Sequence, residues 1–131
     1  MLSKVLIISK DPEHRDLLCS IASGCGAVPV VCGTLPDAQY RLLYQQFAAI
    51  LYEMPDQKDL CAAIRQLAHS ENETPIVVVS QIDNWDSYLA AIAAGAFDCI
   101  DFPPYPKEFE RILHLALSEC RSRKMAIAQQ S

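Results

Sequence analysis

Five short apolar runs alternate along the chain with longer segments of helical spacing, and this alternation restricts the fold more than any other feature. The runs have the length of strands and cover residues 5–8, 27–31, 49–52, 76–79 and 97–100. A chain that passes from strand to helix to strand re-enters the sheet in the same direction, so the alternation favours a parallel sheet. The first, third and fourth runs are apolar throughout, as strands covered by helices on both faces require.

The ends of the helical segments support the same assignment. Asp11 is a typical N-cap residue ahead of Pro12, Asp56 is suited to cap the third segment, and Gly95 ends the fourth. We predict five helices, over about residues 12–24, 34–46, 56–67, 85–95 and 109–120. The polar stretch 121–131 either continues the last helix or frays.

The second strand bears on the order of the sheet. Its Pro29 has no backbone N–H, which places this strand at an edge. An edge position fits the flavodoxin-like order 2-1-3-4-5, an α/β (βα)5 sandwich of three layers. In such folds the functional site lies beyond the carboxyl ends of the central strands. The residues expected there are Ser9, Lys10, Asp11, Glu53, Met54 and Ser80.

Length and charge limit the domain count and the partners. A chain of 131 residues fits one domain, which we place at 1–120, with 121–131 as a polar tail that would begin a linker to an output domain. The chain has 16 Asp and Glu against 11 Lys and Arg, a net charge of -5, which disfavours direct contact with nucleic acid or anionic membranes. We see no signal peptide and no apolar stretch near the roughly 20 residues of a membrane span, so we expect a cytoplasmic protein.

Cysteines and histidines show no catalytic or metal-binding pattern. The six cysteines form no CxxC pair, and we expect them to be reduced thiols, mostly in or beside the core. The three histidines, on separate helices, are expected at the surface or its boundary: His14, His69 and His114. The chain has no zinc signature, nucleophile elbow or P-loop, so we expect neither an enzyme nor a bound metal or cofactor.

Four segments are similar, in order and spacing, to segments of one family. They cover residues 4–15, 47–55, 74–80 and 95–103. On these segments the chain resembles the receiver domain of two-component response regulators, a CheY-like domain, from residue 4 to about 118. The resemblance implies a parallel five-stranded fold and phosphoryl transfer to an aspartate beside a divalent metal, for which hard oxygen ligands are suited.

The family's metal-binding and phosphoacceptor positions carry different residues here. By this resemblance the two metal-binding acids fall on Ser9 and Lys10, and Asp11 lies one step beyond them. The phosphoacceptor aspartate falls on Glu53, while the switch hydroxyl is kept as Ser80. A serine and a lysine do not replace two carboxylates around magnesium, and the longer glutamate is out of line for transfer.

Two further family positions also differ. The family's lysine falls on Phe102, which is followed by a matching Pro103, and the switch aromatic falls on Cys99. Phe102 supplies no charge to a phosphoryl group, so the resemblance implies a degenerate receiver, or pseudo-receiver. We expect Glu53 to form an ion pair with Lys10 across the strand ends, in preference to mimicking a phosphorylated aspartate.

The resemblance implies signalling by protein contact. We expect phosphorylation-independent binding of a protein partner, or dimerisation, through the face of the fourth helix, fifth strand and fifth helix, with regulation of a transcriptional output domain. The interface candidates are Trp85, Tyr88 and Tyr105. Two alternatives stay open: phosphorylation at an unusual acid, Glu53 or Asp11, and a small-ligand module of the flavodoxin type.

Overall fold

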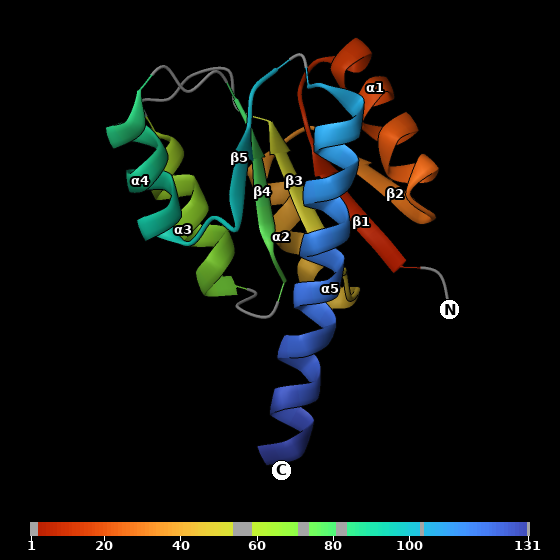
Figure 1. Ribbon diagram of the computed structural model, residues 1–131, viewed down its shortest axis with the longest axis vertical. Coiled ribbons are helices and arrows are strands. Elements are labelled where there is room, and N and C mark those ends of the chain that lie inside the picture. The colour runs from red at the N-terminus through yellow and green to blue at the C-terminus, as the bar shows by residue number, and fades with distance from the viewer. Residues whose placement is uncertain (1–2, 54–58, 71–73, 81–83, 103, 131) are drawn as a thin grey trace.

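The computed structural model, shown in Figure 1, alternates five strands with five helices along the chain. It describes residues 3–53, 59–70, 74–80, 84–102 and 104–130. The strands are β1 (Ser3–Ile8), β2 (Ala27–Cys32), β3 (Ala49–Glu53), β4 (Ile76–Val79) and β5 (Asp98–Ile100). The helices are α1 (Pro12–Gly24), α2 (Leu35–Tyr44), α3 (Leu60–Ser70), α4 (Trp85–Ala94) and α5 (Pro106–Gln130).

The sheet is parallel throughout, with the order β2-β1-β3-β4-β5. This confirms the flavodoxin-like topology that the sequence predicts. Because consecutive strands run in the same direction, their carboxyl ends meet at one edge, toward the top of Figure 1. The central strands β1 and β3 are joined with Val5 opposite Ala49 and Ile8 opposite Tyr52. Their ends therefore lie side by side and place Ser9 beside Glu53.

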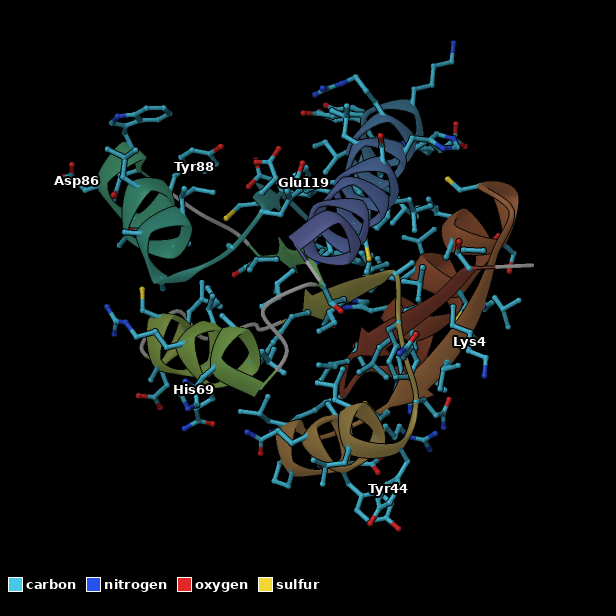
Figure 2. The ribbon with its side chains drawn as sticks, turned by 90° about the horizontal axis from the view of Figure 1, so that it is seen from below. Lys4, Tyr44, His69, Asp86, Tyr88 and Glu119 are labelled. Atoms are coloured by element: carbon cyan, nitrogen blue, oxygen red, sulfur yellow. The ribbon has the colours of Figure 1, made fainter. Side chains whose placement is uncertain are left out.

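Two apolar layers cover the sheet, one on each face. On one side, α1 and α5 pack on alternate residues of the strands, with Leu18, Phe109 and Leu113 fully buried. On the other side, α2, α3 and α4 cover the remaining positions, with Ile64 and Leu67 fully buried. The view in Figure 2, along the long axis, shows the sheet between these layers. Burial on both faces explains why the central strands read as unbroken apolar runs.

The observed elements differ from the predicted ones mainly at their ends. α2 ends at Tyr44, two residues short of the prediction, and β5 has only three residues. α5 is much longer than predicted and continues through Gln130, so the open question about the polar stretch is settled in favour of helix. The predicted cap Asp56 and Met54, which was expected at the strand ends, lie outside the described residues.

The long C-terminal helix leaves the body of the domain. Figure 1 shows its second half projecting beyond the sheet. With 25 residues, α5 is about 37 Å long at the rise of an ideal helix. Searched over the residues that are described, the helices include none with both the length and the apolar character to cross a membrane.

Pro29 lies in β2, at one margin of the sheet, as its missing N–H predicts. β5 forms the opposite margin. The side chains of Val28 and Val31 on β2 remain exposed, whereas residues 5–8 of β1 and 49–52 of β3 are buried. The six cysteines are free thiols, with Cys32 and Cys120 buried and the others half-buried.

Candidate functional site

The turn from β1 into α1 gives two adjacent residues opposite orientations. Ser9 is 1% exposed, and its backbone N–H donates to the carbonyl of Cys32 at 3.1 Å, which extends the strand pairing by one residue. Lys10 is exposed. Successive side chains along extended backbone point to opposite sides, so only one of the two faces the site. The inward position belongs to the serine.

Asp11 is the N-cap residue of α1, and it sets where the helix begins and which of its residues lies over the strand ends. Its Oδ1 accepts from the backbone N–H groups of Glu13, at 2.9 Å, and His14, at 3.3 Å. This is N-capping, in which a short acidic side chain binds the free amides of the first turn. The carboxylate is thereby committed to the helix, and the first turn holds His14 above the end of β3.

Glu53, the last residue of β3, is the centre of the site. Its side chain is 8% exposed, and both carboxylate oxygens have partners. The hydroxyl of Ser9 donates to Oε1 at 2.6 Å, and Nδ1 of His14 lies 2.5 Å from Oε2. A carboxylate in its ionised form only accepts hydrogen bonds, and in that form it would accept from both the serine hydroxyl and the imidazole. The glutamate is thus closed in by groups from β1 and α1.

An aromatic stack covers the same pair. The rings of His14 and Phe102 are stacked, with centroids 3.9 Å apart and an angle of 30° between their planes. Phe102 also packs against the core on the side of α1 and α5. On its other side, Nε2 of His14 lies 3.6 Å from Oδ2 of Asp11. The imidazole is therefore packed on one face by Phe102 and bound through Nδ1 to Glu53, with a carboxylate oxygen of Asp11 near its other nitrogen.

The predicted ion pair between Lys10 and Glu53 is wrong. Within the described part of the chain, Glu53 is bound by Ser9 and His14, and no ion pair joins it to Lys10. The three histidines lie where they were expected, His14 at the boundary of the surface and His69 and His114 exposed. The sequence showed no partner for His14, however, and its contact with Glu53 was missed. The missed signal is the spacing from Asp11 to His14, which puts residue 14 one helical turn above the cap.

The residues at the family's metal positions do not fit a magnesium ion. Mg²⁺ prefers an octahedral set of oxygen ligands that includes carboxylates. The Ser9 hydroxyl is bound to Glu53, Lys10 is exposed and cationic, and the capping oxygen of Asp11 is bound to α1. Over the whole described chain, no three His, Cys, Asp or Glu side chains gather as a group that could hold a metal ion.

The remaining family positions lie along the neighbouring strands. Ser80 is buried directly after β4, and its N–H donates to the carbonyl of Ile100 at 2.9 Å. Cys99 lies in β5 and packs, half-buried, against the α3 side of the core. Pro103 lies outside the described residues. Ser9 and His14 therefore both contact Glu53, and Phe102 joins this network by stacking on His14. The exposed Lys10 lies apart from it.

The thiol of Cys99 gives a prediction about alkaline conditions. Burial, with the nearby carboxylates of Asp98 and Asp101, raises the pKa of Cys99 from 9.0 to about 12. A thiol whose pKa is higher in the folded state contributes stability fully below pH 9, and this contribution is lost as the pH rises toward 12. We expect Cys99→Ala to lose less stability over this interval than the parent, as urea denaturation at several pH values will test. Equal losses would contradict a role for this thiol.

The three interface candidates lie together on another part of the surface. Trp85 and Tyr88 come from α4, and Tyr105 precedes α5. All three line one pocket, whose remaining wall includes β5. The hydroxyl of Tyr88 donates to Oδ1 of Asp98 at 3.0 Å. The sequence-based grouping of these residues therefore corresponds to one continuous surface.

Compared with solved structures, the chain has the fold of CheY-like response-regulator receiver domains. A receiver domain protein of this kind from Methanospirillum hungatei aligns with 93% of this chain and 98% of its own, at a TM-score of 0.80 and 17% identity. NtrX from Brucella abortus, solved in complex with ATP, has a TM-score of 0.84 at 19% identity; the alignment covers all of this chain and 30% of NtrX.

A third similar structure has a different description. A putative pilus assembly-related protein from Burkholderia pseudomallei aligns with 91% of this chain and 92% of its own, at a TM-score of 0.81 and 19% identity. No family model matches the sequence, and no curated protein matches it. At these identities the similarities establish the fold, and the site must be interpreted from its own geometry.

Proposed function

We propose that the chain is a pseudo-receiver that acts in two-component signalling through protein contact, without phosphorylation at Glu53. The fold and the receiver domains among its structural neighbours support the signalling context. One observation carries the rest: the Glu53 carboxylate is bound by Ser9 and His14 and is nearly closed to solvent.

Phosphoryl transfer to a carboxylate has requirements that this site does not meet. The acceptor oxygen must be free to attack in line, and cations must neutralise the transferred group. Here one oxygen of Glu53 accepts from Ser9 and the other contacts His14, and Phe102 stands at the position of the family's lysine. We therefore propose binding and not catalysis as the function of this domain.

The proposed binding surface is formed by α4, β5 and α5. It carries exposed aromatic side chains, Trp85 at 67% and Tyr105 at 79%, together with the exposed Leu89. Exposed large apolar groups that gather on one face are typical of protein contact surfaces. The proposal includes a cytoplasmic setting and regulation of an output domain, and the partner is a protein bound without a phosphodonor.

Incubation with a small phosphodonor and magnesium is expected to leave the intact mass of the protein unchanged. Both carboxylate oxygens of Glu53 already have partners, and the described residues hold no group of side chains suited to a metal ion. Mass spectrometry after incubation with acetyl phosphate checks this, and a receiver that has an aspartate phosphoacceptor and a complete metal site serves as the control. An added phosphoryl group on Glu53 or Asp11 would overturn the proposal and favour a working receiver with an unusual acceptor.

A further inference from the structure

The pocket between α4, β5 and the start of α5 has a definite chemistry. It encloses about 400 Å³, and its wall combines aromatic rings with carboxylates. The residues that define its character are Trp85, Tyr88, Tyr105, Asp101 and Glu108. In Figure 2, Tyr88 lies on the side of α4 that faces α5, between the two helices. The pocket is therefore separate from the network around Glu53.

The aromatic wall is held in a fixed arrangement. The rings of Trp85 and Tyr88 are stacked, with centroids 5.2 Å apart and planes inclined by 19°. They lie one turn apart on α4, and the hydrogen bond from Tyr88 to Asp98 holds the second ring in place. Trp85 nevertheless remains two-thirds exposed, so a large ring face is presented to solvent. A fixed, exposed aromatic face attracts flat or cationic groups.

The charge of the wall has one sign. Asp101 and Glu108 contribute carboxylates, and the described residues that line the pocket include no lysine or arginine. Asp98 adds a third carboxylate just behind Tyr88. Because aromatic faces and carboxylates both favour cations, the two components of the wall select the same kind of ligand. An acidic ligand would meet repulsion at this position.

We propose that the pocket receives the guanidinium group of an arginine from a partner protein. A guanidinium is planar, stacks on aromatic faces and binds carboxylates with two parallel hydrogen bonds, so it matches both components of the wall. The ammonium of a lysine is a compact, strongly hydrated charge and gains less from the rings. This proposal rests on the proposed function, since it names the chemistry of the partner that the α4–β5–α5 surface binds.

The chain contains a built-in reporter for this pocket. Trp85 is the only tryptophan, so its emission follows the pocket alone. The experiment titrates the protein with Nα-acetyl-arginine methylamide at constant ionic strength and records tryptophan fluorescence. The matched neutral ligand is Nα-acetyl-citrulline methylamide, which has the same shape without the charge. We expect a saturable change with the arginine derivative and little change with the citrulline derivative.

Two exposed acids of α5 provide a matched pair of variants. Glu108 lines the pocket, whereas Glu110 does not. We expect Glu108→Gln to weaken arginine binding by roughly two- to fivefold, the range for an exposed ion pair, and Glu110→Gln to leave it unchanged. Circular dichroism checks that both variants are folded. An equal response to arginine and citrulline, or no difference between the two variants, would overturn the assignment.

Other occupants give distinct results. An equal or stronger response to Nα-acetyl-lysine methylamide would overturn the choice of a guanidinium. Self-association in sedimentation that the arginine derivative abolishes would assign the pocket to a second copy of this chain and overturn a different partner. Phosphorylation in the mass experiment would refute the proposed function, whereas absent arginine binding with an unchanged mass would refute the pocket assignment alone.

Discussion

Replacing Gly95 with alanine is expected to destabilise the protein by about 2–4 kcal/mol, the sum of backbone strain and overpacking. Gly95 follows α4 with a φ of 124°, a conformation that residues with a Cβ rarely adopt. A Cβ added there would lie 2.9 Å from the Cβ of Ala68 on α3, well inside normal contact. The close approach of α3 to the end of α4 therefore depends on this glycine.

Gly24→Ala is the matched control for this substitution. Gly24 ends α1 with an ordinary φ, and a Cβ there would meet no atom within 4 Å. We expect its stability to change by less than about 1 kcal/mol, or to rise slightly because alanine restricts the unfolded chain. Urea denaturation of both variants will measure the difference. Equal midpoints for Gly95→Ala and the parent would show that α3 and α4 separate without cost.

Removing both partners of Glu53 should produce the second large effect. The double variant Ser9→Ala/His14→Leu leaves an almost buried carboxylate without its donors, which we expect to cost about 2–4 kcal/mol. The value is below that of a fully buried charge, because His14 is 35% exposed and its loss admits water. Equilibrium denaturation of the double variant and its two single parents measures this cost.

A triple variant separates unpaired charge from lost packing. Adding Glu53→Leu to the double variant removes the carboxylate that has lost its donors, and apolar replacement of a whole polar group is often close to neutral. We therefore expect at least half of the lost stability to return. If the triple variant is no more stable than the double variant, the cost lies in packing against Phe102 and not in the charge.

The strands could be predicted because burial on both faces imposes a simple pattern. The central strands contain unbroken apolar runs, and Pro29 correctly predicted that β2 lies at a margin, which fits the observed order of the sheet. The length of α5 was not predictable in this way. Its second half projects beyond the sheet, so burial against the sheet does not impose on it the apolar spacing that marks the first half as a helix.

The site could be predicted by position but not by partner. Topology correctly places Ser9 and Glu53 together, since β1 and β3 are neighbours. Topology does not determine which side chain after β1 points toward Glu53, because that depends on the residue at which the strand ends and the helix begins. Asp11 begins the helix early enough to raise His14 over Glu53, while Lys10 points to solvent. A capping residue therefore determined the chemistry of the site.

The two margins of the sheet also bear on how the protein behaves at high concentration. Unpaired strand margins are templates on which sheets from different molecules join and precipitate. Here one margin contains Pro29, which removes a donor, and the other is only three residues long. Both features oppose templating. The backbone of either margin is therefore a poor template for joining a second molecule edge to edge.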